Sequence, residues 1–354
     1  MRKHLIAAAI AALAIPTLAL AAPADVATLK AYAIQALSKC PDQKVTIEAV
    51  DKAAPLGFVP YTITQTSSDP TCGRQTTLLY SPLTQQVLIG TIIDLPSDAR
   101  NVDVRVAERA MEVLKQPLTA TVSKFPLPDR IKAVSIYKQT QYGPFAYHGW
   151  VDASERFLII GTRGNLLTPP SKTLLDALNI QNGVRRGNPK AKSQIIELSD
   201  FECPTCRRAH LKLEPIIEKH LSKVDYIRLD LPLFEHHEWA LPAALGARAI
   251  EKVAPKEYWK YVNWVYENQE EIGKRKSFDE VLKEYCQDRD LNWAAIEKIY
   301  RSPAERAALL DQASRAFDNG VVSTPTYIVN GQIMGFGPEG KFTEKAVKEA
   351  LGVK

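Results

Sequence analysis

The sequence predicts two folded parts, an α+β N-terminal region over residues 25–165 and an α/β domain with a helical insertion over residues 193–354. Between them, residues 181–193 are polar and contain Gly, Pro and basic residues, which is linker composition. Before the linker, short segments alternate between apolar and polar residues, as half-buried strands do. After it, a short apolar strand leads into an amphipathic helix. These three observations define the predicted architecture.

The first residues predict export. Arg2 and Lys3 precede an apolar run from Leu5 to about Ala21, and Ala19 and Ala21 form a small-residue cleavage pattern. We therefore expect residues 1–21 to be a secretory signal peptide and the mature protein to be periplasmic or otherwise exported, where disulfides persist. An uncleaved membrane anchor is the alternative. No later stretch of the sequence is apolar enough to span a bilayer, so we expect no membrane span in the mature chain.

The composition is that of an ordinary globular protein. The chain has 354 residues, of which 45% are hydrophobic and 24% are charged. Its formal net charge of +5 is mild, and no long basic run occurs in the sequence. Nucleic acid is therefore not an expected partner.

The N-terminal region contains a weak internal repeat. Residues 78–91 can be laid over residues 148–162 so that Gly90 meets Gly161, and each stretch reads as a strand, a polar turn and a strand. Each follows an amphipathic segment with helical spacing. The implied unit is one helix followed by about four antiparallel strands, used twice. A single α+β domain with chance similarity is the alternative.

Two of the five cysteines belong to this region. Cys40 follows the first predicted helix, and Cys72 lies in the turn "SDPTCGRQ". In an exported domain this pair predicts a structural disulfide. A redox role is the alternative, but nothing near these residues in the sequence is of a type that activates a thiol.

The connection between the two parts occupies residues 166–192. Pro169 and Pro170 precede a helical segment that Ser171 can cap and that Asn182-Gly183 can end. We expect a connecting helix followed by the linker.

Cys203 and Cys206 in "IIELSDFECPTCRRAH" carry the chemistry. The apolar spacing starts a helix at the first cysteine, with Pro204 in the first turn, where its missing N–H is tolerated. The helix N-terminus favours negative charge, so it stabilises a thiolate at Cys203. Cys206 lies one turn further on and closer to the core. A disulfide between them closes a very small ring, which can open and close without unfolding the domain.

Other functions of a close cysteine pair fit less well. A structural zinc site needs four ligands, and only His210, His236 and His237 are offered as partners. Covalent haem needs a histidine directly after the second cysteine, where Arg207 stands. A static bridge over two residues removes little chain entropy. Redox cycling is the favoured interpretation.

Two more stretches belong with this pair. Residues 320–336 read as a loop, a strand, an Asn330-Gly331 turn and a second strand, with Pro325 at the strand entrance. Whether the Thr324–Pro325 bond is cis or trans stays open.

Glu197 lies inside an apolar strand, where burial of a carboxylate is destabilising unless it has a partner or a function. It could relay protons for Cys206; a water-facing position is the alternative.

Together, "IIELSDFECPTCRRAH", "VDYIRLDLPL" and "VSTPTYIVNG" resemble the DsbA-like branch of the thioredoxin superfamily. In that family a helical insertion separates the active-site helix from a cis-proline, and residues 239–319 fit such an insertion. The resemblance covers about 193–354 and implies a thioredoxin-like fold. It implies that Cys203 is the nucleophile, Cys206 the resolving thiol and Glu197 the buried acid. It also implies that Pro325 is the cis-proline and that Thr324 offers backbone groups to the substrate.

The N-terminal region faintly resembles the cystatin-like dimerisation domain of DsbC and DsbG, the periplasmic isomerases, although it is about twice as long. A homodimer and an isomerase activity are therefore open alternatives.

The expected function is that of an exported thiol:disulfide oxidoreductase acting on protein substrates and recycled by a redox partner. No metal, nucleotide or haem cofactor is needed, because the Cys203–Cys206 disulfide is itself the redox group. A disulfide isomerase or reductase of DsbC/DsbG type is one alternative, and a periplasmic client-binding chaperone with an accessory redox pair is another.

Cys286 lies on an apolar helical stripe, which predicts a buried, inert thiol.

Overall fold

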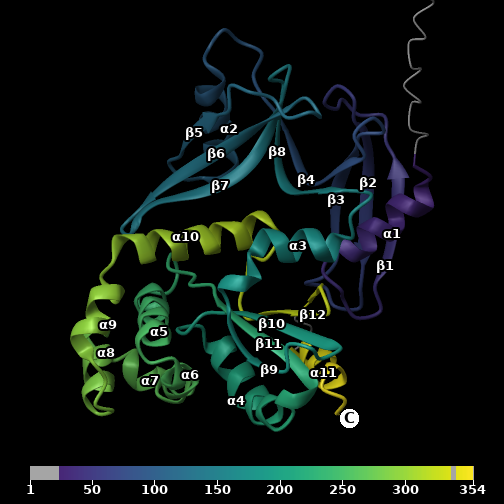
Figure 1. The fold of residues 1–354 in the computed structure, drawn as a ribbon. Coiled ribbons are helices and arrows are strands. Elements are labelled where there is room, and N and C mark those ends of the chain that lie inside the picture. Colours follow the sequence, from purple (N-terminus) through teal and green to yellow (C-terminus); the bar gives the residue numbers. More distant parts are fainter. Residues whose placement is uncertain (1–23, 336–339, 354) are drawn as a thin grey trace, which may run out of the picture.

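The computed structural model describes residues 24–335 and 340–353. The predicted signal peptide, residues 1–21, lies outside the described residues. Within the part of the chain that the structure describes, no helix has both the length and the apolar character needed to cross a membrane. The described residues form two sheets with helices packed against them (Figure 1).

The N-terminal region forms one eight-stranded antiparallel sheet in the order β1-β2-β3-β4-β8-β7-β6-β5. Its first half consists of α1 (Val26–Ala36), β1 (Lys44–Ala49), β2 (Val59–Thr66), β3 (Arg74–Tyr80) and β4 (Gln86–Asp94). Its second half consists of α2 (Val102–Leu114), β5 (Thr119–Val122), β6 (Ile131–Thr140), β7 (Gly143–Asp152) and β8 (Phe157–Asn165). Both halves therefore have the same element order, one helix and then four strands.

The two halves join where β4 pairs with β8, and Gly90 lies opposite Gly161 at this junction. A Cβ atom at Gly90 would lie 2.1 Å from the carbonyl oxygen of Ile160, and one at Gly161 would lie 2.1 Å from that of Ile89. The close approach of the two strands therefore requires glycine at both positions.

Both helices pack on the same face of this sheet. Val87 and Ile89 of β4 belong to the core under α1, and Ile93, on the same side of the strand, belongs to the core under α2. The helices thus cover the two ends of the face and leave its middle for the C-terminal domain (Figure 1).

The C-terminal domain begins with α3 (Pro170–Leu178) and contains a five-stranded sheet in the order β13-β12-β10-β11-β9. Strands β10 (Ser193–Ser199) and β11 (Val224–Asp230) are parallel, and the other pairings are antiparallel. The remaining elements are β9 (Val184–Gly187), α4 (Pro204–Lys219), β12 (Thr326–Val329), β13 (Gln332–Met334) and α11 (Lys341–Ala350). This is the thioredoxin-like α/β arrangement that the sequence predicts for this half.

One part of the predicted linker is a strand. Residues 184–187 form β9, whose backbone pairs with β11. Arg185 forms an ion pair with Asp225, and Arg186 forms one with Glu214. The polar, basic composition therefore reflects an edge strand whose side chains are paired, and composition alone cannot distinguish such a strand from a linker.

A block of helices separates β11 from β12, where the helical insertion is expected. It consists of α5 (Ala240–Val253), α6 (Tyr258–Glu267), α7 (Gln269–Ile272), α8 (Phe278–Gln287), α9 (Trp293–Tyr300) and α10 (Pro303–Asp318). Cys286 is fully buried on α8, and burial raises the pKa of its thiol to about 11. The last helix, α10, lies between this block and the N-terminal sheet (Figure 1).

The predicted Cys40–Cys72 disulfide is present, and it lies against the C-terminal domain. The N–H of Lys39 donates to the carbonyl of Ile333 at 2.8 Å, and the N–H of Gly335 donates to the carbonyl of Lys39 at 2.7 Å. A Cβ atom at Gly335 would lie 2.8 Å from the Cys72 sulfur. The disulfide therefore supports a segment that extends the five-stranded sheet at its β13 edge.

Replacing both cysteines, Cys40→Ser with Cys72→Ser, is expected to lower the free energy of unfolding of the N-terminal region by about 3–4 kcal/mol, since the bridge closes a loop of 32 residues. Amide hydrogen exchange at Gly335 should also accelerate, because its partner segment loses its anchor. Urea unfolding followed by hydrogen exchange measures both effects. Unchanged protection at Gly335 would contradict the role assigned to the disulfide at the domain junction.

Candidate active site

Cys203 occupies the N-cap of α4, directly after the turn that follows β10. Pro204 stands in the first helical turn, where the missing N–H leaves no bond unmade. The Cys203 side chain is nearly buried, and its sulfur lies 3.6 Å from the carbonyl oxygen of Thr324. The Thr324–Pro325 peptide bond is cis. The fold thus brings the cysteine pair and the Thr324-Pro325 turn together across 121 residues of sequence.

The two thiols of the pair have opposite acid–base properties. A hydrogen bond from the Cys206 side chain, which favours the Cys203 thiolate, is the largest cause that lowers the pKa of Cys203, to about 6. The backbone N–H groups of Cys206 and Thr205 in the first turn of α4 act in the same direction, and burial opposes them. Burial raises the pKa of Cys206 well above its ordinary value. At neutral pH the site therefore holds one thiolate and one neutral thiol.

Asp200 organises the turn between β10 and α4. Its backbone N–H donates to the Cys206 sulfur at 3.5 Å. Its carboxylate accepts hydrogen bonds from the N–H groups of Glu202, at 2.8 Å, and Leu233, at 2.7 Å. The same carboxylate lies 2.7 Å from Nδ1 of His237. The turn that carries Cys203 is thereby tied to the segment just before the insertion.

His237 brings a titratable group to the site. Its hydrogen bond to Asp200 is the largest cause that raises the pKa of its imidazole, and the negative charge of Cys203 contributes. A protonated imidazole in this position favours the thiolate. The sequence suggests His237 first as a capping or surface histidine and otherwise as a zinc ligand. Asp200 goes unidentified, because nothing in the local pattern places these two residues beside each other.

Gln269 of α7 fixes the same turn from the insertion. Its side-chain amide is buried and donates to the carbonyls of Phe201, at 2.8 Å, and Cys203, at 3.2 Å. Sequence analysis does not identify this residue, since a glutamine between two helices carries no recognisable signal.

Replacing Gln269 with Leu leaves these two carbonyls without their donor, so we expect the free energy of unfolding to fall by about 1–3 kcal/mol. The pKa of Cys203 should change as well, because the turn that positions its sulfur loses a support. Urea unfolding and thiol alkylation across pH measure the two effects. Gln287→Leu, at an exposed position at the end of α8, is the matched control and should change neither.

Glu197 is buried in β10 and has charged and polar partners. It accepts hydrogen bonds from the Tyr226 hydroxyl and from Nη1 of Arg228, the latter at 3.1 Å. Burial opposes ionisation of the carboxyl, but Arg228 and His210 hold its pKa below the ordinary value. The described residues show no direct hydrogen bond from Glu197 to Cys206. The Ser199 hydroxyl, two residues further along β10, hydrogen-bonds with the Tyr266 hydroxyl at 2.8 Å, and it acts to lower the pKa of both Glu197 and Cys206.

Arg228 of β11 is the largest fully buried side chain in the described residues, and it connects the site to the core. Its guanidinium bonds with Glu197, with Asp230 at 3.2 Å and with the Tyr266 hydroxyl at 3.1 Å. That hydroxyl in turn contacts Ser199 and the Asp200 carbonyl. In the sequence, the stretch "VDYIRLDLPL" indicates the family resemblance but does not indicate a role for Arg228. An arginine between the apolar residues Ile227 and Leu229 is the signal that could have identified Arg228.

No group of three His, Cys, Asp or Glu side chains within residues 24–335 and 340–353 is arranged to hold a metal ion. His210, named above as a possible ligand, is buried and hydrogen-bonds with Asn263 at 2.9 Å.

A parallel β10–β11 pair, a cysteine pair at the start of α4 and a cis-proline ahead of β12 define a thioredoxin-fold domain with a dithiol site. Residues 179–351 match the family model described as Thioredoxin. This match covers most of the C-terminal domain and supports a thioredoxin-like fold for it.

Several known proteins are similar to part of the chain. The Na(+)/H(+) antiporter NhaA 3 of Salinispora tropica is 29% identical over 150 residues, which are 42% of this chain and 21% of the antiporter. The probable disulfide bond formation protein D of Bacillus cereus is 23% identical over 170 residues, which are 47% of this chain and 77% of that protein. The chain thus spans about a fifth of the antiporter and about three quarters of the Bacillus protein.

Solved structures give weaker matches. The thiol-disulfide exchange protein alpha-DsbA2 of Wolbachia pipientis is 19% identical with a TM-score of 0.41, and the match covers 51% of this chain and 95% of that one. BdbD of Bacillus subtilis is 17% identical with a TM-score of 0.42, and the match covers 49% of this chain and 95% of that one.

Proposed function

We propose that the protein is a thiol:disulfide oxidoreductase that exchanges disulfides with protein substrates through Cys203 and Cys206. One observation carries the proposal: a thiol with a pKa of about 6 stands at a helix N-terminus, beside a buried second thiol and the carbonyl of Thr324. A simple binding protein has no need of this combination. The family of the C-terminal domain and the names of its Bacillus and Wolbachia relatives support the proposal.

The reaction starts from the Cys203–Cys206 disulfide. A substrate thiolate attacks the Cys203 sulfur, the Cys203–Cys206 bond breaks, and Cys206 leaves and takes up a proton. A second substrate thiolate then attacks the substrate sulfur of the mixed disulfide, and Cys203 leaves as a thiolate. The substrate loses two electrons and the cysteine pair gains them. A partner that carries a disulfide reoxidises the pair.

The acidity of Cys203 favours the oxidase direction. A thiol with a pKa of about 6 is a good leaving group, and its thiolate stabilises the reduced pair relative to the disulfide. The alternative isomerase activity requires the reduced pair as the resting form.

Three further residues have proposed roles in this reaction. Glu197 exchanges a proton with Cys206 by way of the Ser199 hydroxyl, which acts on the pKa of both groups. The backbone of Thr324 pairs with the substrate chain beside Cys203, and cis-Pro325 holds that backbone in place.

Three assays on the same preparation test the proposal: insulin reduction, oxidative refolding of a reduced protein and refolding of a protein with scrambled disulfides. We expect Cys203→Ser to abolish all three activities and Cys206→Ser to trap mixed disulfides. Activity that survives in Cys203→Ser would refute the redox function. Client binding with no exchange in the native protein would favour the chaperone alternative.

We infer that the N-terminal region consists of two cystatin-like units and that residues 1–21 direct export. The shared helix-plus-four-strand order of the two halves supports the first inference. Because β4 and β8 already join the halves within one chain, the sheet needs no second copy for completion. We therefore expect a monomer, and light scattering distinguishes it from the homodimer alternative.

A further inference from the structure

A cleft of about 320 Å³ lies between the N-terminal sheet and the C-terminal domain. On the sheet side its wall includes Thr76, Ile89 and Ile160, and on the other side it includes Phe317 and Val322. We call it the inter-domain cleft. Its volume lies within the range of about 300–1,000 Å³ that is usual for ligand sites, and it is mostly apolar.

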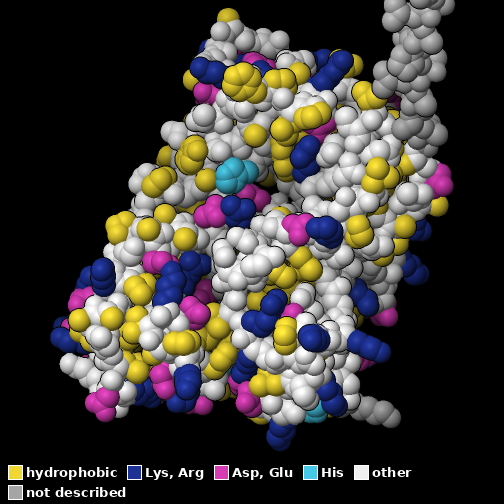
Figure 2. All heavy atoms as spheres, viewed as in Figure 1, with side chains coloured by type: hydrophobic (Ala, Val, Ile, Leu, Met, Phe, Trp, Pro, Cys, Tyr) yellow, Lys and Arg dark blue, Asp and Glu magenta, His cyan; other side chains and the backbone are white. Residues whose placement is uncertain are grey.

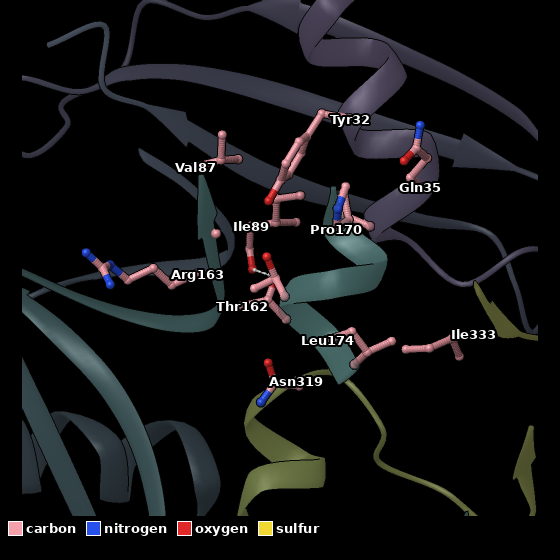
Figure 3. Close-up of a pocket in the computed structure, with 13 residues that line it drawn as sticks. Tyr32, Gln35, Val87, Ile89, Thr162, Arg163, Pro170, Leu174, Asn319 and Ile333 are labelled. Atoms are coloured by element: carbon pink, nitrogen blue, oxygen red, sulfur yellow. Dashed lines mark hydrogen bonds between the residues drawn. The ribbon is translucent and has the colours of Figure 1, made fainter. Parts of the chain in front are cut away.

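The sheet leaves this space open because α1 and α2 cover only the ends of its face. Figure 3 shows a neighbouring pocket that shares Ile89, Thr162 and Asn319 with the cleft, and Asn319 directly follows α10. Tyr32 of α1 and Leu174 of α3 line this second pocket.

The wall of the cleft continues to the catalytic cysteine. Val322 is 62% exposed, and it precedes Thr324 by two residues, a span of at most about 7 Å. The carbonyl of Thr324 lies 3.6 Å from the Cys203 sulfur. A polypeptide that forms a mixed disulfide with Cys203 can thus continue along this wall into the cleft.

Arg74 gives the cleft a cationic group without a carboxylate partner. It lines the cleft, and its side chain has one hydrogen-bond partner in the described part of the chain, Gln65, at 3.1 Å. Arg74 is exposed, and no carboxylate is among the groups that influence its pKa. His148 and Asp318 also line the cleft, and they pair with each other: Nδ1 of His148 lies 2.6 Å from a carboxylate oxygen of Asp318. Elsewhere on the face seen in Figure 2, Lys and Arg are interspersed with Asp and Glu.

We propose that the inter-domain cleft binds an extended segment of the substrate polypeptide while Cys203 reacts, and that Arg74 selects segments with an acidic side chain. This inference rests on the proposed oxidoreductase function and specifies its substrate class. Arginine is suited to the role because its planar guanidinium bonds with a carboxylate through two parallel N–H groups.

Pairs of disulfide-bonded cysteine peptides test the inference. Each pair differs only in a Glu or a Lys, placed three to eight residues from the cysteine in successive pairs. We expect kcat/KM for exchange to favour the Glu peptide about tenfold at one spacing, the factor that a single charge-assisted hydrogen bond supplies. The effect should lie mainly in KM.

Arg74→Glu should reverse the preference, and Arg74→Gln should abolish it. Lys30→Glu, on the exposed surface of α1 and outside the cleft lining, is the matched control and should keep the native preference. Hydroxyethyl disulfide, which is neutral and too small to span the cleft, should exchange equally with all four proteins.

The outcomes separate the two hypotheses. If hydroxyethyl disulfide does not exchange with the native protein, the oxidoreductase function itself fails. If it exchanges normally but no peptide pair shows a preference, or the preference survives Arg74→Glu, the substrate site in the cleft is refuted.

Discussion

Alkylation of the reduced protein by iodoacetamide should follow a single titration with a midpoint near pH 6, because the pKa of Cys203 is lowered to about 6. The thiolate is the reactive form, so the rate rises through this pH and then stays constant. The absorbance of the thiolate at 240 nm gives an independent midpoint. A midpoint above pH 8 would contradict the assigned environment of Cys203.

Variants of the pair separate the causes of this acidity. Cys206→Ala removes the hydrogen bond that is the largest cause, so the Cys203 midpoint should move to higher pH. Cys203→Ser should remove the titration entirely. Cys286 provides an internal control, since burial raises its pKa to about 11 and it should not react in this range.

The acidity of Cys203 also has a consequence for stability. Because the pKa is lowered in the folded state, the thiolate contributes stability to the reduced protein that is fully present above the unfolded value near 9 and is lost as the pH falls through about 6. The disulfide form has no such group. The reduced protein should therefore lose stability relative to the oxidised protein as the pH falls from 9 to 6.

Arg228→Met should lower the free energy of unfolding by about 3–5 kcal/mol, since it leaves buried carboxylates without their cation. Glu197 and Asp230 both bond with this guanidinium, and both are buried. Urea unfolding at neutral pH measures the loss. Arg301→Met is the matched control: Arg301 forms ion pairs with Asp279 and Glu297 on the surface, and its loss should change the stability by less than about 1 kcal/mol.

The pH dependence identifies the cause of the loss. In the native protein the lowered pKa of Glu197 contributes stability that is present above its ordinary value and is lost as the pH falls through the folded value. Without Arg228, burial raises the pKa of Glu197. In acid the Glu197 carboxyl is then protonated, and the variant no longer holds an uncompensated buried charge. The difference in the free energy of unfolding between the native protein and Arg228→Met should become smaller as the pH falls. Adding Glu197→Gln to the variant should restore part of its stability. A gap that is constant with pH would mean that lost packing, and not an uncompensated charge, causes the effect.

The local features of this chain were predictable from its sequence. Alternating spacing identified strands of the N-terminal region within residues 78–91 and 148–162, because burial of one face imposes a period on the residues that form it. An apolar run identified the strand that ends at Ser199. The helix start at Cys203 followed from Pro204 and the apolar spacing after it. The Cys40–Cys72 disulfide followed from two cysteines in an exported domain. Each of these depends on neighbours in the chain.

What the tertiary structure decided depends on contacts between distant residues. Residues 184–187 have the composition of a linker, yet pairing with β11 makes them a strand. His237, just before the insertion, and Gln269, within it, reach the turn around Cys203 from more than thirty residues further along the chain. Arg74 lines a cleft together with Val322 because α1 and α2 leave the middle of the sheet uncovered. Periodicity reports which side of an element is buried, but only the packing of the elements determines which groups meet there.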